Sequence, residues 1–323
     1  MQYRILPGTD LRVSAIGLGT AHFGSQVDVA TSCRLLDRFI EQGGNLLDTA
    51  RVYAAWVPHG MGASERTIGR WLRRRGNRAS VVVATKGGHP DLRTMTVPRL
   101  DRTQITADCH ASLRALGCDY IDLYWLHRDD ESRPVDDLLE TLEHLVAAGK
   151  IRWYGCSNWS VDRMRAAQEI AHRHGCRGFV ANQPQWSLAE INADSVTDPT
   201  LRRMDAAMQR FHQETGMAVI PYGAQAQGFF SKAAAHGLDA LPAPLRRAYD
   251  NPTNRRRLAR LKYWADVTSH SVTALALGYL VSHSDFVTIP LIGAQHLWQL
   301  DESLAAADLV LPSDILRDLE APQ

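Results

Sequence analysis

Short apolar runs recur along the chain and are separated by longer, more polar stretches. Each run is rich in Val, Ile and Leu and is continuously apolar instead of alternating between apolar and polar positions. Continuous runs are typical of strands that are covered on both faces. The runs that we predict to be strands lie near residues 16–20, 46–50, 81–86, 120–127, 151–158, 179–185, 218–224 and 285–293.

Helical patterns lie between these runs. Apolar residues between positions 105 and 116 recur at three- and four-residue spacing, so they would share one helix face, and Gly117 is suited to end that helix. The same spacing recurs over residues 138–146, ahead of Gly149. Ser160 stands where the N-cap of a further helix belongs.

Eight predicted strands that alternate with helices imply right-handed crossovers, and eight such units close into a barrel. No change in composition and no linker rich in Pro or Gly divides the chain. We therefore predict one (β/α)8 TIM-barrel domain over residues 1–323. Residues 3–6 and 11–14 flank the turn-rich Pro7-Gly8-Thr9-Asp10 and predict an N-terminal β-hairpin that plugs one end of the barrel.

One connection is longer than the others. The segment from Gln225 to about Trp264 contains Pro242, Pro244 and Pro252, and we predict a long loop after the seventh strand. Long loops in compact domains are usually functional, and this one follows a strand on the face where barrel enzymes carry their active sites.

Composition narrows the class of protein. The 323 residues carry a net charge of +1, which favours neither a nucleic-acid nor a membrane partner. We find no signal-peptide pattern and no apolar stretch of membrane-spanning length. The cysteines are odd in number and widely spaced, which indicates neither a disulfide framework nor a zinc site. We expect a cytoplasmic protein without a metal site, and its oligomeric state stays open.

Polar residues end three of the predicted strands. Asp48, Lys86 and His127 each follow an apolar run, and Tyr53 comes five residues after Asp48. Each of them alone has an ordinary explanation as a helix cap, a surface residue or a core histidine. Because the carboxyl ends of parallel barrel strands meet at one face, the four together predict a catalytic site.

The chemistry of these four residues is consistent with proton donation. A free phenol has a pKa near ~10, which is too high for an efficient acid at neutral pH. An adjacent Lys86 ammonium would lower the pKa of Tyr53, and Asp48 would hold Lys86 in place. His127 can then orient a carbonyl oxygen that Tyr53 protonates.

None of these residues supplies a hydride, so this chemistry needs a cofactor. A Gly-x-Gly-x-x-Gly loop is absent, and Gly17-Leu18-Gly19-Thr20 lacks the third glycine, so we predict a cofactor that lies across the barrel mouth. Ser157, Asn158 and Gln183 at later strand ends can hold a carboxamide, and Tyr222 can stack on a flat ring.

The chain resembles the aldo-keto reductases along nearly its whole length. The segments that carry this resemblance are Gly17-Leu18-Gly19-Thr20, Asp48-Thr49-Ala50 with Tyr53, Ala84-Thr85-Lys86, Leu126-His127, Gly155-Cys156-Ser157-Asn158, Asn182-Gln183, Pro221-Tyr222 and Gln299-Leu300-Asp301-Glu302-Ser303. The resemblance implies a (β/α)8 barrel that binds NADP(H) or NAD(H) in an extended conformation. It also implies hydride transfer from this cofactor to an aldehyde or ketone.

The resemblance also implies roles for individual residues. Tyr53 would be the acid, Lys86 and Asp48 would tune it, and His127 would orient the substrate. The residues implied to bind cofactor are Gly19, Thr20, Asp48, Ser157, Asn158, Gln183, Tyr222, Gly223, Ala224, Gln225, Gly228, Gly293, Gln295, Gln299, Glu302 and Ser303.

This chain departs from the family pattern at two phosphate-binding regions. Gly223-Ala224-Gln225 follows Tyr222 where the family often has Ser-Pro-Leu, which leaves the pyrophosphate contacts open. Soon after Gly293, where many members have an arginine that faces the adenosine 2′-phosphate, this chain has Gln295 and His296. The departure weakens the expected preference for NADP(H), unless Arg255 or Arg257 of the long loop reaches the adenosine.

We expect the substrate pocket to be aromatic and partly polar, which suits a sugar-like or aromatic carbonyl compound. Its predicted residues are His22, Phe23, Trp56, His89, Trp125 and Trp159. Packing in the core is an equal alternative for Trp125. Two other functions stay open, namely a cofactor-binding regulatory subunit with little turnover and an unrelated barrel hydrolase. The lack of suitably paired strand-end acids argues against the hydrolase.

Overall fold

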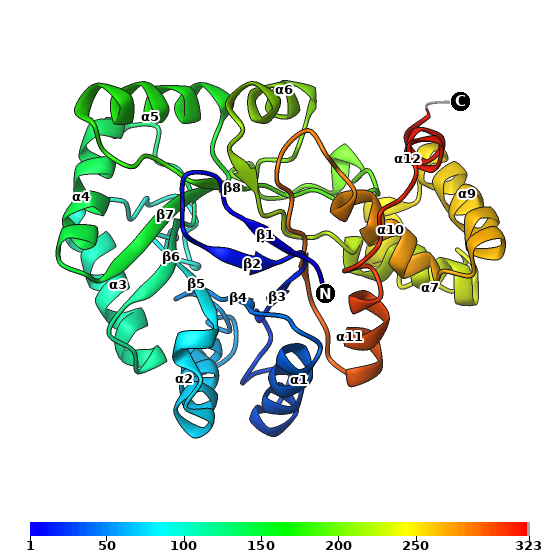
Figure 1. The fold of residues 1–323 in the computed structure, drawn as a ribbon, viewed down its shortest axis with the longest axis horizontal. Helices are drawn as coiled ribbons and strands as arrows, with labels where there is room; N and C mark the ends of the chain where they lie inside the picture. The colour runs from blue at the N-terminus through cyan, green and yellow to red at the C-terminus, as the bar shows by residue number, and fades with distance from the viewer. Residues whose placement is uncertain (322–323) are drawn as a thin grey trace.

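An eight-stranded parallel sheet forms the centre of the protein, as a computed structural model of residues 1–321 shows (Figure 1). In chain order its strands are β3 (Gly17–Gly19), β4 (Leu46–Asp48), β5 (Val82–Gly87), β6 (Ile121–Leu126), β7 (Ile151–Ser157), β8 (Ala181–Gln183), β9 (Ala218–Val219) and β10 (Leu291–Ile292). The spatial order is β10-β3-β4-β5-β6-β7-β8-β9, so strands β3 to β9 pair in chain order and the last strand, β10, pairs with β3. All eight predicted strands are confirmed.

Hydrogen bonds between the first and last strands of this order close the sheet. The Val219 amide donates to the Val287 carbonyl at 2.8 Å, and the Ile289 amide donates to the Val219 carbonyl at 2.9 Å. A further parallel bridge joins Val219 to Thr288. These bonds connect β9 to the segment that leads into β10, so the curled sheet forms the barrel that the sequence predicts.

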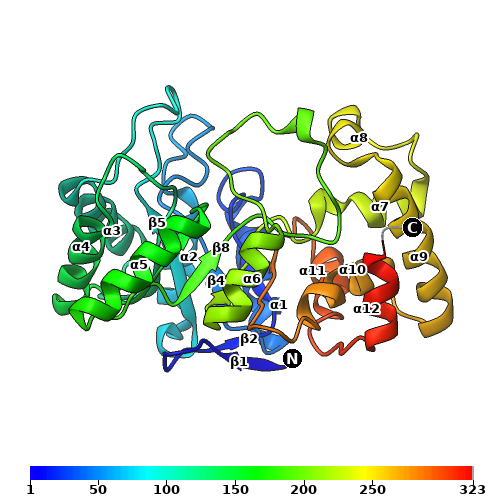
Figure 2. The ribbon, with the colours of Figure 1, turned by 90° about the horizontal axis from the view of Figure 1, so that it is seen from above.

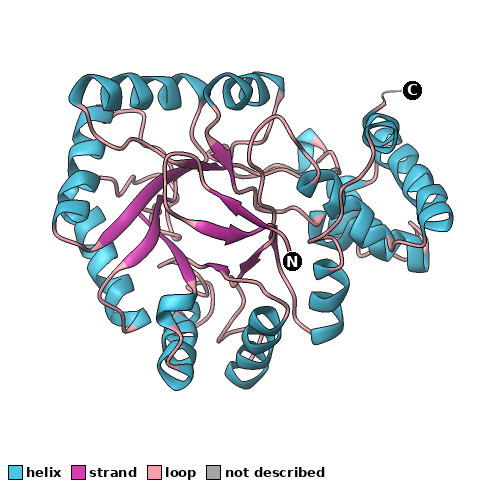
Figure 3. Ribbon diagram, in the orientation of Figure 1, coloured by secondary structure: helices cyan, strands magenta, loops and turns pink. Residues whose placement is uncertain are grey.

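Helices surround the sheet (Figure 3). They are α1 (Val29–Glu41), α2 (Ala63–Arg75), α3 (Arg102–Leu116), α4 (Val135–Ala147), α5 (Val161–His174), α6 (Ala206–Thr215), α7 (Phe229–His236), α8 (Ala243–Tyr249), α9 (Pro252–Thr268), α10 (Val272–Val281), α11 (Leu297–Leu304) and α12 (Ser313–Glu320). Gly117 ends α3 in a left-handed conformation, and Ser160 caps α5 by accepting a hydrogen bond from the Arg163 amide. None of the helices within residues 1–321 is long and apolar enough to cross a membrane.

The predicted N-terminal hairpin is present and closes one end of the barrel. Strands β1 (Tyr3–Ile5) and β2 (Arg12–Ser14) pair in antiparallel register. Leu6, Leu11 and Val13 are buried in the cluster that fills the barrel interior. Figure 2 shows the hairpin at one end of the molecule and the long connections at the opposite end.

The long connection after β9 exists, but it is helical instead of being a loop. Three helices, α7, α8 and α9, occupy most of residues 225–264, and α9 packs against α7, α10 and α12. Pro242 stands at the N-cap of α8, and Pro252 lies in the first turn of α9. Proline is tolerated at these positions because the first helical amides have no partner within the helix, so these prolines start helices and do not break them.

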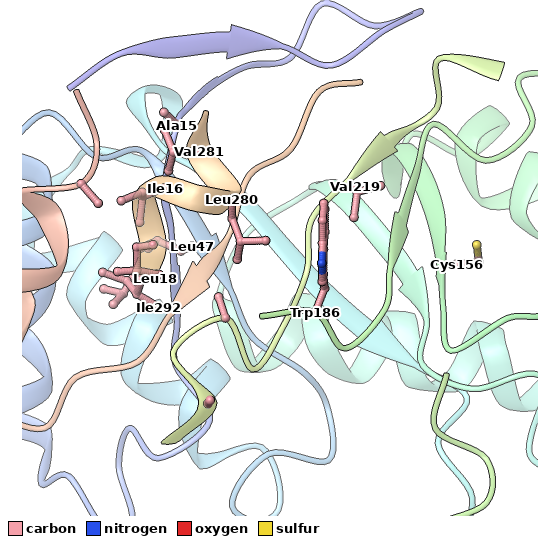
Figure 4. Close-up of a cluster of buried hydrophobic side chains, with 14 of the residues drawn as sticks. Ala15, Ile16, Leu18, Leu47, Cys156, Trp186, Val219, Leu280, Val281 and Ile292 are labelled. Atoms are coloured by element: carbon pink, nitrogen blue, oxygen red, sulfur yellow. The ribbon is translucent and has the colours of Figure 1, made fainter. Parts of the chain in front are cut away.

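Two apolar layers lie on the two faces of the sheet. Side chains on the outer face, such as Leu18, Leu47 and Ile292, pack against the helices, including Leu280 of α10 (Figure 4). Side chains on the inner face, such as Leu46, fill the barrel interior. Because successive side chains of a strand point to opposite faces, Leu46 and Asp48 of β4 both face inward.

Candidate active site

The inner face of the barrel continues into the four residues predicted to be catalytic. Ala84 and Lys86 lie two residues apart on β5, and Trp125 and His127 lie two residues apart at the end of β6, so the polar residue of each pair is directed inward. In both pairs the deeper residue belongs to the apolar interior. The polar residues therefore lie at the carboxyl end of the barrel.

Lys86 is the centre of this group. It is fully buried and forms an ion pair with Asp48. Its Nζ atom also donates to the Thr49 carbonyl at 2.8 Å and to the Tyr53 hydroxyl at 3.0 Å. The other oxygen of the Asp48 carboxylate accepts a hydrogen bond from the Gln183 amide at 3.0 Å. Asp48 and Tyr53 are thus fixed on two sides of one buried ammonium group.

The surroundings shift the pKa of both partners. Burial raises the pKa of the Tyr53 phenol above its ordinary value, and the Lys86 charge opposes this shift without reversing it. The expectation of a lowered pKa for Tyr53 is therefore corrected, because desolvation of the phenolate outweighs the attraction of Lys86. Burial lowers the pKa of Lys86, but Asp48 and Tyr53 raise it by more, so its net pKa is also raised.

His127 lies next to Tyr53, with the two ring centroids 6.0 Å apart in an edge-to-face arrangement. Burial and the nearby Arg128 charge hold the pKa of His127 well below its ordinary value. The ring is therefore neutral at physiological pH and can donate one hydrogen bond. Its Nδ1 atom is buried and has no hydrogen-bond partner within residues 1–321.

A row of aromatic rings extends from these residues on both sides. The Trp56 ring lies 6.4 Å from the Tyr53 ring and 6.1 Å from the His22 ring, and His89 lies 4.7 Å from His127. The structure thus brings three of the predicted substrate-binding residues to the candidate site. Phe23 is almost fully buried and still contributes to the pocket wall described below.

Trp125 and Trp159 are placed elsewhere. Both are fully buried, and neither lines the pockets that adjoin Tyr53 and Lys86. The Trp125 indole fills the barrel interior beside Gly155, where an added Cβ atom would lie 2.5 Å from the ring. Trp159 packs against Phe179 with a centroid distance of 4.9 Å. Aromatic bulk fills the core at these two positions.

A pocket of about 620 Å³ runs from Asp48 and Tyr53 to α11, and we refer to it as the long pocket. Its volume falls within the usual range for small-molecule sites, about 300–1,000 Å³. Its wall contains every residue expected to bind cofactor except Thr20, Ser157, Asn158 and Gln183.

These four residues are buried, and hydrogen bonds join Ser157, Asn158 and Gln183 to one another. The Asn158 amide donates to the Ser157 hydroxyl at 3.0 Å, and Ser157 donates to the Gln183 carbonyl at 2.9 Å. The Asn158 side-chain oxygen accepts from the Tyr222 hydroxyl at 2.8 Å. Thr20 donates to the Asp48 carbonyl at 2.8 Å. The network fixes the Tyr222 ring in the pocket wall.

Other predicted side chains connect the segments around the long pocket. Gln225 accepts a hydrogen bond from the Gly293 amide at 2.8 Å and donates to the Ser303 hydroxyl at 2.9 Å. The Gln299 side chain accepts from the Gln295 amide at 2.8 Å and from the His296 amide at 3.2 Å, and so caps α11. Gln225 and Gln299 therefore hold the end of β9, β10 and α11 together.

Several residues that line the long pocket were missed in the sequence, and three of them have side chains suited to a ligand. Lys232 of α7 and Trp298 of α11 line it, and Trp298 is stacked on His296 with an interplanar angle of 10°. Thr273 also lines it, and its hydroxyl is buried without a partner in the described chain. In the sequence, Lys232 could have been noticed because it follows the predicted cofactor-binding residue Gly228 by four positions. The prediction of a long loop did not place the two residues side by side.

Two arginines considered for the adenosine are engaged elsewhere. Arg255 pairs with Asp250 at 2.7 Å, and Arg257 pairs with Glu190 at 3.0 Å and donates to the Leu188 carbonyl at 2.8 Å. Neither lines the long pocket. The helical structure of the insertion fixes α9 away from this pocket.

Comparison with known proteins agrees with this geometry. The profile of the Aldo/keto reductase family matches residues 15–321. The chain belongs to this family. The match covers the whole barrel and begins just after the hairpin, so the strand-end residues described above all fall within it.

Relatives come from fungi and bacteria. The chain is 30% identical to norsolorinic acid reductase stcV of Emericella nidulans, over 98% of this chain and 80% of the relative. It is 29% identical to the uncharacterized oxidoreductase YrpG of Bacillus subtilis, with 99% and 95% covered, and to the protein tas of Escherichia coli, with 99% and 97% covered. The family match and the names of the first two relatives support an oxidoreductase.

Proposed function

We propose that this protein reduces an aldehyde or ketone to the alcohol with NADP(H) or NAD(H), and that Tyr53 donates the proton. The observation that carries this proposal is the 3.0 Å hydrogen bond from Lys86 to the Tyr53 hydroxyl, with Lys86 itself paired to Asp48. A phenol with a raised pKa holds its proton at neutral pH. The adjacent ammonium stabilises the phenolate that remains after the proton has moved to the substrate oxygen.

His127 would orient the substrate. A neutral imidazole beside Tyr53 can donate a hydrogen bond to the same carbonyl oxygen, and it carries no positive charge that would compete with Lys86. Trp56 and His22 would contact the body of the substrate. The row of rings favours an aromatic substrate, and a sugar-like substrate is the second candidate.

The long pocket fits a dinucleotide. Tyr222 offers a flat ring near Tyr53, and Lys232 offers a cation near Gly228, where a Cβ atom added to the glycine would lie 3.6 Å from the ammonium. Trp298 offers an apolar face at the far end, and the Thr273 hydroxyl, unpartnered within residues 1–321, is available to a ligand. When bound there, a reduced nicotinamide supplies the hydride.

We assign Lys232 to the pyrophosphate, because it lies beside Gly228 at the N-cap of α7. Gln295 at the adenosine end is a neutral amide, so we expect NADP(H) to be used with less discrimination against NAD(H) than a charged residue would give. Ser157, Asn158 and Gln183 would bind the carboxamide. Hydrogen bonds to the carboxamide would replace some of the bonds that these three residues now form with one another.

The test is to follow NADPH and NADH absorbance with a panel of aldehydes and ketones. Rapid turnover that requires both cofactor and carbonyl compound supports the proposal. The runner-up is a cofactor-binding regulatory subunit, which would bind the cofactor tightly and turn over very slowly. A protein that binds neither cofactor contradicts both.

A further inference from the structure

A second hollow adjoins the catalytic residues, and we call it the side hollow. It has a volume of about 420 Å³, and no residue that lines the long pocket lines it. Its wall comes from residues 51–61 after β4, from residues 86–99 of β5 and the following loop, and from Asp108 of α3. Two residues of its wall adjoin the candidate catalytic residues. Lys86 is one of the catalytic residues itself, and the ring of His89 packs on His127.

The side hollow carries one uncompensated positive charge. Its cations are Arg51, Lys86, Arg93 and Arg99. Three of them have an acid of their own, since Lys86 pairs with Asp48, Arg93 with Asp91 at 2.7 Å, and Arg99 with Asp108 at 3.0 Å. The guanidinium of Arg51 makes no ion pair and no hydrogen bond with any part of residues 1–321.

Glu65 on α2 lies near Arg51, but the two side chains form no ion pair. It is fully buried, and its carboxyl group accepts a hydrogen bond from Thr85 at 2.7 Å but forms no ion pair with the described residues. Burial raises the pKa of Glu65 by more than its hydrogen bonds and the Arg51 charge lower it. The charge of Arg51 therefore remains available to a ligand in the side hollow.

The backbone of Arg51 is held in a fixed position relative to Tyr53, the proposed proton donor. Its backbone amide donates to the Lys86 carbonyl at 3.0 Å, and it precedes Tyr53 by two residues. Apolar side chains of the same wall, Val52, Met61 and Leu92, can contact a hydrocarbon or aromatic body. A guanidinium binds a carboxylate through two parallel hydrogen bonds, and an anion offsets the cost of a partly desolvated cation.

We propose that the side hollow binds a carboxylate carried by the carbonyl substrate, with Arg51 as its ligand. The inference rests on the proposed function and names the substrate class, an oxoacid with an apolar body between its two groups. In the reaction, the carbonyl carbon gains a hydride with its two electrons from NADPH, which becomes NADP⁺. The carbonyl oxygen gains the Tyr53 proton, and the carboxylate is unchanged.

The test compares 4-carboxybenzaldehyde with its neutral methyl ester, methyl 4-formylbenzoate. Arg51→Met should lower the ratio of kcat/KM for the acid to that for the ester by about ten- to hundredfold, the scale for losing a hydrogen bond to a charged group. Arg51→Lys should recover part of this ratio. Arg70→Met is the matched control, because Arg70 is an exposed arginine that lines neither the side hollow nor the long pocket, and its ratio should stay near that of the wild type.

A binding measurement separates recognition from turnover. In the presence of NADP⁺, calorimetry should show that the wild type binds benzoate more tightly than benzamide, and that Arg51→Met removes this difference. An unchanged ratio and an unchanged benzoate affinity in the Arg51 variants would overturn the proposal. If neither aldehyde is reduced although benzoate binding depends on Arg51, the proposed function fails and the carboxylate site stands.

Discussion

At the scale of single residues, Tyr53 experiences opposing influences on its pKa. Burial favours the neutral phenol, whereas the Lys86 ammonium 3.0 Å away favours the phenolate. The balance leaves the phenol protonated at neutral pH and still able to release its proton to an adjacent oxyanion. The Asp48 charge adds to the effect of burial by raising the pKa of Tyr53, and Asp48 also holds the ammonium and accepts a hydrogen bond from the Gln183 amide.

Removal of the phenol should therefore abolish reduction without removing the cofactor site. Tyr53→Phe should lower kcat by several orders of magnitude, the scale for losing a positioned acid together with its contact to the developing oxyanion. The affinity for NADPH, measured by fluorescence quenching, should change little. Near-normal turnover in this variant would mean that another residue donates the proton.

The role of Lys86 can be read from a pH profile. Reduction requires protonated Tyr53, so the rate falls as pH rises through the pKa of the phenol. Because Lys86 lowers this pKa relative to burial alone, Lys86→Met should raise it, move the alkaline limb to higher pH and lower the plateau. Circular dichroism should first establish that the variant is folded, and an unshifted limb would then remove Lys86 from the mechanism.

At the scale of elements, the N-terminal hairpin closes the end of the barrel that is opposite the candidate site. Its turn places Leu6 and Leu11 in the inner cluster, which also contains Leu46 of β4 and Trp125 of β6. The hairpin thus covers apolar surface that the eight strands would otherwise expose to water. Its contribution should appear in stability and not in catalysis.

A pair of substitutions measures that contribution. Leu11 is 2% exposed, and Leu11→Ala should lower the free energy of unfolding by about 2–5 kcal/mol, because it leaves a cavity under the hairpin. Ile5 on β1 is 61% exposed, and Ile5→Ala should change it by less than about 0.5 kcal/mol. Urea unfolding gives both values. Equal effects would show that the hairpin does not seal the barrel.

At the scale of the whole molecule, the long pocket is assembled from segments that lie far apart in the chain. Gly19 of β3, Lys232 of α7 and Trp298 of α11 meet in one wall. Gln225, which precedes α7, is hydrogen-bonded to Gly293 after β10 and to Ser303 of α11. Cofactor preference is therefore a property of how the insertion and α11 pack on the barrel.

Two substitutions distinguish the phosphate contacts. Lys232→Met should weaken NADPH and NADH binding alike, by about tenfold, because the pyrophosphate is common to both cofactors. Gln295→Arg should strengthen NADPH binding alone, by one to two charged hydrogen bonds of about 1.5–3 kcal/mol each at most. Fluorescence titration with both cofactors tests this. A wild type that already prefers NADPH by a thousandfold or more would contradict the argument from Gln295.

The sequence alone determined the eight strands, the hairpin and the convergence of Asp48, Lys86 and His127. These features depend on local patterns: continuous apolar runs predict covered strands, and the geometry of parallel strands brings their carboxyl ends to one face. The side-chain alternation that directs Lys86 inward is likewise set by the two-residue period of a strand.

Other features depended on which surfaces pack together. The insertion after β9 is helical, with Pro242 and Pro252 at helix starts, and proline content alone does not reveal that placement. Trp125 and Trp159 resemble pocket residues in sequence, but packing buries both in the core. Only the tertiary structure showed that burial outweighs the Lys86 charge in setting the pKa of Tyr53. It also showed that, of the cations lining the side hollow, Arg51 is the one without an ion pair to an acid within residues 1–321. Desolvation and ion pairing depend on residues that are distant in the chain.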